Sequence, residues 1–283
     1  MQLETRLRRI TTTLRRVPGG VLVGEKIRKR FGRTARKLTV NDFDGDLTMH
    51  LDLGEHMQSQ IFWHGSYSRN ILYLLRKILR PGMTFVDGGA NVGEISLVAA
   101  KRVGPSGRVL AFEPVDAFAD QLQRHRDDNR LDNIEILRMG LSDQPGTAPL
   151  YLAESAYADG THHDGLGTLF LSDVRSRQAA TIPLVTLDAM LDGAPPDLMK
   201  LDIEGAELAA LHGARDLLSR GAPDLIIEIG RDTCRAAGYD MEDILAFLEP
   251  YGYVFHRIGR KGALRAITAA DLGRFQNVYC ARS

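Results

Sequence analysis

The sequence predicts an α/β fold: a doubly wound, mostly parallel sheet of seven strands, preceded by an N-terminal extension of helix and β-hairpin. The first observation is alternation, because from residue 84 onward short apolar runs alternate with stretches of helical length. This alternation is typical of crossover units, which build a parallel sheet covered on both faces. The second is composition: 283 residues, 44% hydrophobic and 25% charged, exclude a disordered or fibrous chain.

Seven apolar runs supply the predicted strands of residues 84–283, which we expect to form one domain. The last two are predicted to close the sheet as an antiparallel hairpin. The stretch 151–180 is rich in Gly, Ser and Asp and is interpreted as a long lid or binding loop. The strands are predicted at 84–87, 108–113, 134–139, 198–202, 224–229, 254–258 and 277–281, and the helices at 94–102, 117–129, 206–219 and 241–250.

Two smaller segments precede this domain. Residues 38–83 are predicted to hold a strand pair, with a turn at Asp44-Gly45, and then a helix over 68–79. Residues 1–37 begin with an amphipathic helix whose apolar residues recur at steps of three and four. They carry twelve basic and two acidic residues, a net charge of +10, whereas the rest of the chain carries −10.

The basic segment 1–37 suggests a partner. Its apolar stripe is first interpreted as a face that packs on the domain or in a homodimer. Because a basic amphipathic helix can also lie on an anionic membrane, a peripheral contact with such a surface is the alternative. Nucleic acid is disfavoured, because aromatic residues are not interleaved with the basic ones and the rest of the chain is acidic.

The search for targeting signals and the number of cysteines indicate the cellular compartment. No apolar run approaches the ~18–20 residues of a membrane-spanning helix, and the arginine-rich start does not resemble a secretory signal. Cys234 and Cys280 are too few for a disulfide scaffold or a cysteine zinc site. We therefore expect a cytoplasmic protein, and a peripheral attachment to the inner face of the membrane is compatible with that location.

A glycine-rich turn, Asp87-Gly88-Gly89-Ala90-Asn91-Val92-Gly93, joins the first strand of the domain to a helix. Glycine lets a ligand approach the backbone closely, and ligands of open α/β sheets bind at the carboxyl ends of the strands. The dinucleotide fingerprint G-x-G-x-x-G is absent, because Asn91 stands at its middle glycine. No Lys-Ser/Thr pair follows, which also excludes a phosphate-binding P-loop.

Two acidic residues end neighbouring predicted strands and indicate the ligand. Asp87 can hold an amino group, and Glu113 can accept both hydroxyls of a ribose. Acids without a compensating arginine suit a nucleoside that bears an amino acid and a positive charge, and they suit a pyrophosphate badly. S-adenosylmethionine (SAM) is such a ligand. The alternative is that Asp87 caps the next helix and Glu113 is a solvated strand end.

Five motifs make the chain resemble the FkbM-type SAM-dependent methyltransferases, within the class I Rossmann-like methyltransferases. They occur in the order of that family and lie within residues 63–230. The resemblance implies that fold, SAM as cofactor, and methyl transfer to a sugar or to a natural product of polyketide or peptide type. The motifs are Asp87 to Gly93, Phe112-Glu113-Pro114, Gly140-Leu141-Ser142-Asp143, Thr186-Leu187-Asp188 and Lys200-Leu201-Asp202-Ile203-Glu204-Gly205-Ala206-Glu207.

The same resemblance implies which residues bind SAM. The glycine turn would line its methionine and ribose end, Glu113 would hold the ribose, and Ser142 and Asp143 would flank the adenine. An ordinary turn is the alternative for Ser142 and Asp143. Tyr67 is followed by Ser68, where the family usually has an acid. The full set of predicted cofactor-binding residues is Tyr67, Asp87, Gly89, Asn91, Gly93, Glu113, Ser142, Asp143 and Asp202.

Methyl transfer to a hydroxyl requires alignment of donor and acceptor and a general base for the hydroxyl proton. Asp202 ends the fourth predicted strand of the domain and Glu204 follows it, so both are candidate catalytic residues. His163, within 151–180, and His64, before the domain, are further candidates. For each histidine a surface or packing role is the alternative.

A metal site is a separate hypothesis. Asp202 and Glu228, at the ends of neighbouring strands, can hold Mg²⁺, which prefers carboxylates and water. No asparagine follows Glu228, so the sequence leaves metal dependence open. Glu207 is interpreted as an acid that the dipole at a helix N-terminus stabilises.

These observations predict a SAM-dependent O-methyltransferase that acts on a small-molecule or glycan acceptor. A methyltransferase directed at nitrogen or RNA is one alternative, although Asp202-Ile203-Glu204-Gly205 stands where a base-nitrogen enzyme has an Asn/Asp-Pro-Pro-aromatic motif. A non-catalytic binding protein with the SAM fold is the other.

Overall fold

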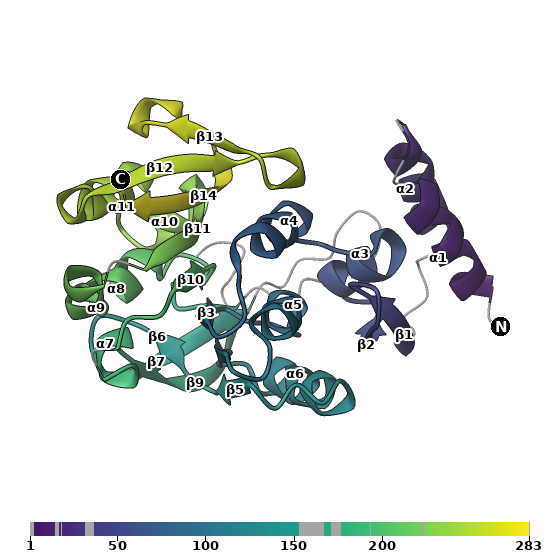
Figure 1. Ribbon diagram of the computed structural model, residues 1–283, viewed down its shortest axis with the longest axis horizontal. Coiled ribbons are helices and arrows are strands. Elements are labelled where there is room, and N and C mark those ends of the chain that lie inside the picture. Colours follow the sequence, from purple (N-terminus) through teal and green to yellow (C-terminus); the bar gives the residue numbers. More distant parts are fainter. Residues whose placement is uncertain are drawn as a thin grey trace. The chain divides into compact units, whose positions relative to one another are not determined.

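A computed structural model describes residues 3–14, 17, 19–31, 37–152, 167–170, 177–192, 194–221 and 223–282. The chain divides into two compact units (Figure 1). The N-terminal unit consists of Met1–Ser68 with Ala153–Leu166, and the sheet unit of Arg69–Leu152 with Gly167–Ser283. Within the described residues no helix is both long enough and apolar enough to cross a membrane.

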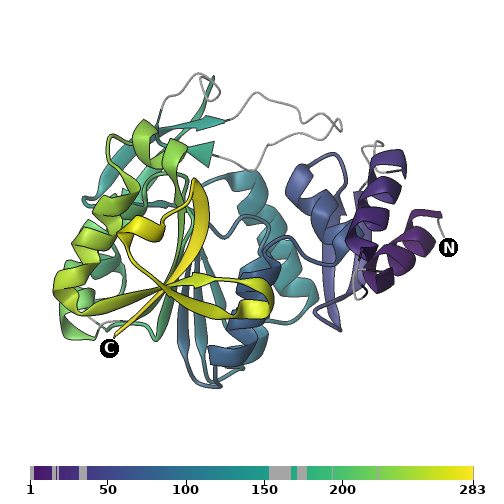
Figure 2. The same cartoon turned by 90° about the horizontal axis from the view of Figure 1, so that it is seen from above.

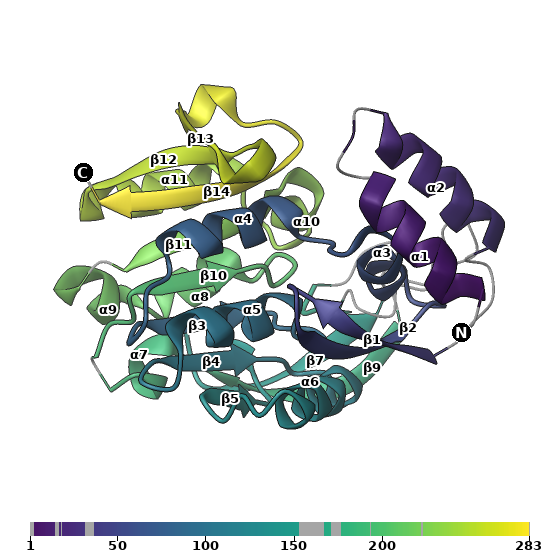
Figure 3. The ribbon, with the colours of Figure 1, turned by 45° about the vertical axis from the view of Figure 1, so that its right-hand side comes forward.

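The N-terminal unit combines three helices with the predicted strand pair. Helices α1 (Leu3–Leu14) and α2 (Gly20–Phe31) lie side by side and both contact α3 (His56–His64) (Figure 3). Strands β1 (Lys37–Phe43) and β2 (Leu47–Asp52) are antiparallel, and α3 packs on β2. Helices α2 and α3 were not predicted. The buried face of α3 includes Gln58, Ser59 and His64, so the helix shows no apolar stripe.

The sheet unit is built on eight strands in the order β13-β12-β14-β11-β10-β3-β4-β5. The five strands from β11 to β5 are mutually parallel, and β14 pairs antiparallel with both β11 and β12. The strands are β3 (Thr84–Gly88), β4 (Arg108–Phe112), β5 (Ile134–Leu137), β10 (Leu198–Leu201), β11 (Asp224–Gly230), β12 (Tyr253–Ile258), β13 (Leu264–Ile267) and β14 (Phe275–Arg282).

This sheet confirms the doubly wound, mostly parallel prediction and corrects its strand number. The predicted C-terminal hairpin is present as β12 and β14, but β13 adds an eighth strand at the edge beside β12 (Figure 2). Strand β13 was missed because it is short and three of its four residues are exposed, so no alternation of apolar and polar residues marks it.

Helices cover both faces of the sheet, as the alternation predicted. Strand residues such as Val86, Leu110, Met199 and Ile227 join the main hydrophobic core with α7, α8, α9 and α11. Helices α4 and α5 contact strands from the opposite face (Figure 3). The helices are α4 (Arg69–Ile78), α5 (Glu94–Val103), α6 (Asp116–Asp128), α7 (Leu187–Met190), α8 (Glu207–His212), α9 (Arg215–Arg220), α10 (Arg231–Ala236) and α11 (Met241–Leu248).

Two boundaries differ from the sequence-based expectations. Helix α4, grouped above with residues 38–83, belongs to the sheet unit, where it packs against α5 and β12. The helix predicted over 206–219 is divided into α8 and α9 at Gly213. A Cβ atom on Gly213 would lie 2.1 Å from the carbonyl oxygen of Ser142, so this break allows close contact with a neighbouring loop.

Within the stretch 151–180 the structure describes residues 151–152, 167–170 and 177–180, each of which includes strand residues, and the rest of the predicted loop lies outside the described residues. A second sheet has the order β6-β9-β7-β8, and β7 pairs antiparallel with β9 over most of its length. Its strands are β6 (Gly140–Leu141), β7 (Gly146–Leu152), β8 (Gly167–Thr168) and β9 (Arg177–Val185). These strands were not predicted, because they present few buried apolar residues, with Leu141, Leu150 and Ile182 as the main ones.

Candidate active site at the carboxyl ends of the central strands

The glycine turn after β3 is held by direct backbone contacts. The N–H groups of Gly89 and Ala90 both donate to the carbonyl oxygen of Phe112, at 3.0 Å each. Gly89 has a φ of +76°, and a Cβ atom there would lie 2.0 Å from the carbonyl oxygen of Asp202. The turn after β3 and the loop after β10 therefore touch through their backbones, and this contact requires glycine at position 89.

Gly93 offers a test of the same turn with a moderate effect. It has a φ of +91°, and a Cβ atom would lie 2.3 Å from Cδ1 of the buried Leu122. Gly93→Ala should lower the free energy of unfolding by about 2 kcal/mol, since left-handed backbone costs alanine ~1–2 kcal/mol and Leu122 must also move. Gly252→Ala is the control, because Gly252 has nearly the same backbone conformation (φ +83° and ψ +21°, against +91° and +19° at Gly93) and its added Cβ would meet only the side chain of Arg282, at 3.9 Å. Equal losses in urea unfolding would contradict the role of packing at Gly93.

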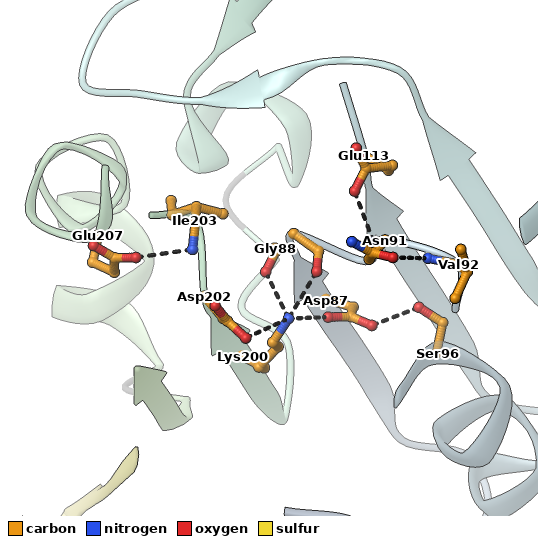
Figure 4. A network of polar contacts seen from close by, with 11 residues as sticks. Asp87, Gly88, Asn91, Val92, Ser96, Glu113, Lys200, Asp202, Ile203 and Glu207 are labelled. Atoms are coloured by element: carbon orange, nitrogen blue, oxygen red, sulfur yellow. Dashed lines mark hydrogen bonds and ion pairs between the residues drawn. The ribbon is translucent and has the colours of Figure 1, made fainter. Parts of the chain in front are cut away.

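Lys200 connects the two strand ends (Figure 4). Its Nζ atom donates to the carbonyl oxygens of Gly88 (3.1 Å) and Gly89 (2.8 Å), and lies 3.1 Å from Asp87 Oδ1 and 3.6 Å from Asp202 Oδ2. The side chain is only 3% exposed. Burial alone would lower the pKa of Lys200, but the carboxylates of Asp87 and Asp202 raise it above the ordinary lysine value. Lys200 is therefore a buried ammonium group.

Asp87, at the start of the turn, contacts two protein side chains. It is fully buried, and its Oδ2 atom accepts a hydrogen bond from Ser96 Oγ on α5 at 2.6 Å, while Oδ1 faces Lys200. This differs from the expectation that Asp87 holds a ligand amino group, because a carboxylate with no exposed surface and two protein partners does not reach a ligand directly. The reason is the register of the sheet, which places Asp87 directly opposite Lys200.

Glu113, just after β4, lies beside the glycine turn. Its Oε2 atom accepts from the backbone N–H of Asn91 at 2.7 Å and its Oε1 atom from that of Val115 at 2.9 Å. Burial raises the pKa of Glu113 to about 7, although these two hydrogen bonds lower it in part. Because an ionised carboxylate offers about four lone-pair sites, Glu113 can still accept hydrogen bonds from a ligand.

Three carboxylates gather at the ends of β10 and β11. One oxygen each of Asp202, Glu204 and Glu228 lies within 4.8 Å of the others. Asp202 is 28% exposed at its side chain, and Glu204 has a φ of +55°. Burial raises the pKa of Glu228 well above the ordinary value, and the charges of Asp202 and Glu204 raise it further. The cluster therefore brings together carboxyl groups that can accept a proton.

Glu207 braces the loop that carries this cluster. Its two oxygens accept the backbone N–H groups of Ile203 (2.8 Å) and Gly205 (2.9 Å), and the hydroxyl of Tyr239 donates to Oε2 at 3.2 Å. Burial raises its pKa to about 7. The loop is also held by Thr168 of β8, which donates to the carbonyl oxygen of Glu204 at 2.7 Å. Glu207 thus accepts hydrogen bonds from the loop backbone at the start of α8, in keeping with its interpretation as a residue of a helix N-terminus.

Ser142 and Asp143 follow β6. The backbone N–H of Ser142 donates to the carbonyl oxygen of Val185, and its hydroxyl donates to Asp143 Oδ1 at 3.1 Å. Asp143 is exposed. Leu141, the residue before them, approaches the glycine turn, since a Cβ on Gly88 would lie 3.1 Å from Leu141 Cδ1. The predicted adenine contacts of Ser142 and Asp143 remain a prediction.

The remaining candidates lie elsewhere. Tyr67 and His64 belong to the N-terminal unit, where His64 is buried with Nε2 3.2 Å from Oε2 of Glu25. His163 lies outside the described residues. Sequence reasoning did not assign roles to Lys200 and Tyr239. Lys200 gave a signal, since a lysine between apolar residues of a buried strand needs an acidic partner.

Similarity to known proteins agrees with this geometry. Residues 87–255 match the family described as the methyltransferase FkbM domain. The chain belongs to the FkbM methyltransferase family. The crystal structure of methyltransferase FkbM from Methylobacillus flagellatus KT has the same fold, with a TM-score of 0.50, 22% identity, and coverage of 76% of this chain and 48% of that one. The fold is the class I fold of SAM-dependent methyltransferases.

Two curated relatives of this FkbM-family chain carry names that describe their activity. Methyltransferase sdnD of Sordaria araneosa is 34% identical over 153 residues, which are 45% of this chain and 59% of sdnD. Hexuronic acid methyltransferase AglP of Haloferax volcanii is 26% identical over 183 residues, which are 64% of this chain and 67% of AglP. The chain therefore spans somewhat more than half of the length of sdnD.

Proposed function

We propose that this chain is a SAM-dependent O-methyltransferase that methylates a hydroxyl group of a sugar or natural product. The observation that carries the proposal is the carboxylate cluster of Asp202, Glu204 and Glu228 at the ends of β10 and β11. A carboxylate at such a strand end is suited to accept the proton of an alcohol as the new bond to oxygen forms. The family and the fold supply the methyl-transfer chemistry.

The residues of the crevice fit SAM. Glu113 retains lone pairs for ribose hydroxyls, and the glycine turn beside it admits a ligand close to the backbone. The crevice residues Glu113, Asp202, Glu204 and Glu228 are acidic, whereas the ammonium group of Lys200 is already paired with the buried Asp87 (Figure 4). This excess of negative charge favours a cationic ligand and disfavours a pyrophosphate.

These positions suggest a separate role for each residue of the site. SAM, when bound, supplies a methyl group already activated by the positive sulfur. Asp202, whose side chain is 28% exposed, accepts the proton of the acceptor hydroxyl, and Glu204 and Glu228 lie beside it in the cluster. Lys200 and Glu207 hold the loop backbones in place. The sugar or natural-product acceptor is proposed from the relative AglP, which is named as a hexuronic acid methyltransferase.

Two measurements test this function in sequence. Calorimetric titration with S-adenosylhomocysteine, with NAD as a parallel control, should show micromolar binding of the first and no heat from the second. Release of S-adenosylhomocysteine from SAM is then followed with hexuronic acids and hydroxylated natural products as acceptors. Heat from NAD alone would overturn the choice of cofactor, and binding without turnover on any hydroxyl acceptor would favour the nitrogen-directed, RNA-directed or non-catalytic alternative.

Substitution of the cluster separates catalysis from binding. Asp202→Asn keeps the shape of the side chain but removes the proton acceptor, so turnover should fall by about 10²-fold, while S-adenosylhomocysteine should still bind. Asp132→Asn, which changes an exposed carboxylate between α6 and the start of β5, outside the cluster and the predicted cofactor site, is the matched control for turnover. The same three carboxylates are the ligand type that Mg²⁺ prefers. Loss of turnover on addition of EDTA, restored by Mg²⁺, would replace the proton-acceptor role by a metal site.

A further inference from the structure

The outer faces of helices α1 and α2 carry a combined basic and apolar surface. On α1, Arg6, Arg9, Ile10 and Thr13 are exposed, at the spacing of one helical face. On α2, exposed residues follow the same spacing from Leu22 onward. We call these residues the hairpin surface: Arg6, Arg9, Ile10, Val17, Leu22, Val23, Lys26, Lys29 and Arg30.

The apolar part of the hairpin surface is unusual for this chain. Leu22 is 71% exposed, Val17 52%, Ile10 49% and Val23 47%. Half of the large hydrophobic residues that are exposed in the described chain therefore lie within residues 10–23. Val17, Leu22 and Val23 gather around the connection between the two helices, where a Cβ on Gly20 would lie 3.1 Å from Val17 Cγ2.

The charged part of the surface has one sign. Every charged residue that is exposed in the described parts of residues 3–31 is basic. The acidic residue of α2, Glu25, is engaged instead by Arg28, whose two nitrogens donate to its oxygens at 2.9 and 2.7 Å. The surface thus combines five exposed cations with four exposed aliphatic side chains.

The opposite faces of these helices hold them in the N-terminal unit. Thr11 Oγ1 donates to the carbonyl oxygen of Trp63 at 2.5 Å, and the buried Arg8 pairs with Asp42 at 2.6 Å. Gly24 lies against His64, since a Cβ there would approach His64 Cε1 at 3.4 Å. The outward direction of the hairpin surface is therefore fixed by contacts within the unit.

We propose that the hairpin surface binds anionic lipid membranes. Its cations complement anionic headgroups, and its aliphatic side chains match the shallow apolar insertion of an interfacial helix. A nucleic acid would use the cations but not the aliphatic groups, and residues 1–30 contain no aromatic residue for stacking. A symmetric dimer through this face would place its cations against themselves. The proposal does not depend on methyl transfer.

Vesicle flotation with the full chain tests the proposal. The protein should bind vesicles of equimolar phosphatidylglycerol and phosphatidylcholine, and it should not bind vesicles of phosphatidylcholine alone. Arg6→Gln/Arg9→Gln/Lys26→Gln should weaken binding by roughly 10²-fold, since each cation near an anionic surface contributes roughly a fivefold factor. Leu22→Gln/Val23→Gln should weaken it at least roughly tenfold through lost apolar burial.

Two controls make a negative result informative. Arg124→Gln/Arg260→Gln/Arg265→Gln removes the same number of exposed cations from the sheet unit and should leave binding unchanged. The single tryptophan, Trp63, is fully buried beneath α1, so its unchanged emission shows that a hairpin variant keeps the N-terminal unit folded.

Four outcomes would overturn the proposal. One is equal binding to both kinds of vesicle, or to neither. Another is unchanged vesicle binding by the folded hairpin variants. The third is RNA binding that depends on the cations but not on Leu22 and Val23, which would assign the surface to nucleic acid. A dimer that these substitutions dissociate, without vesicle binding, would assign it to self-association.

Discussion

Replacing Lys200 with methionine should lower the free energy of unfolding by about 3–5 kcal/mol, because it leaves a buried carboxylate without its partner. Asp87 is fully buried, and Lys200 lies 3.1 Å away with 3% of its side chain exposed. The substitution also removes the donor to the carbonyl oxygens of Gly88 and Gly89. Methionine has a similar length, so a cavity contributes little. Urea unfolding at neutral pH measures the effect.

A double-mutant cycle shows whether the loss arises from the pair. Asp87→Asn removes the buried negative charge, so Lys200→Met should cost less in that background than in the natural chain. Ser96, which donates to Asp87 Oδ2, can retain a hydrogen bond to the asparagine oxygen. If Lys200→Met costs less than ~1 kcal/mol, as an exposed ion pair would, Lys200 does not hold the site together.

The sequence predicted the sheet well for a simple physical reason. Central strands such as Leu198–Leu201 are buried on both faces, and continuous apolar runs between helices identify them. Edge and surface strands lack this signal: β13 exposes three of its four residues, and β9 follows a stretch rich in small polar residues. Prediction therefore succeeded in the core and missed β13 and the strands of the second sheet.

The candidate site was predicted in part. Asp202, Glu204 and Glu228 were found because acids at strand ends meet at one edge of a parallel sheet. The pair of Lys200 and Asp87 was not found, because it depends on which strands are neighbours. These residues lie more than a hundred positions apart in the sequence, and they become register partners only once β10 is placed beside β3.

Glu113 should give the largest effect on cofactor binding. If its carboxylate accepts two ribose hydroxyls, Glu113→Gln should weaken binding of S-adenosylhomocysteine by about 10²–10⁴-fold, since hydrogen bonds to a charged group are worth ~1.5–3 kcal/mol each. The N–H groups of Asn91 and Val115 donate to different oxygens of Glu113, so the single amide oxygen of glutamine can accept from only one of them. Urea unfolding of the variant therefore checks that the fold survives. Retained affinity would remove Glu113 from the cofactor site.

The pH dependence of binding gives a sharper test, because its sign is fixed. Burial raises the pKa of Glu113 to about 7 in the free protein. Hydroxyl donors favour the ionised carboxylate, so ligand binding lowers this pKa and releases a proton. Affinity should therefore be constant above pH 7 and fall up to about tenfold per pH unit below it, reaching about 100-fold at pH 5. Calorimetry in two buffers of different ionisation enthalpy measures the released proton.

Two variants assign that proton to a residue. Burial also raises the pKa of Glu207 to about 7, so Glu207 is the competing source. In Glu113→Gln the affinity should no longer fall below pH 7. Any change of affinity with pH that remains belongs to another group or to the ligand itself. In Glu207→Gln the fall below pH 7 should persist, because the oxygens of Glu207 face the N–H groups of Ile203 and Gly205. If instead Glu207→Gln abolishes the pH dependence and Glu113→Gln does not, the released proton comes from Glu207 in the loop after β10. Glu113 would then be a structural carboxylate of the glycine turn.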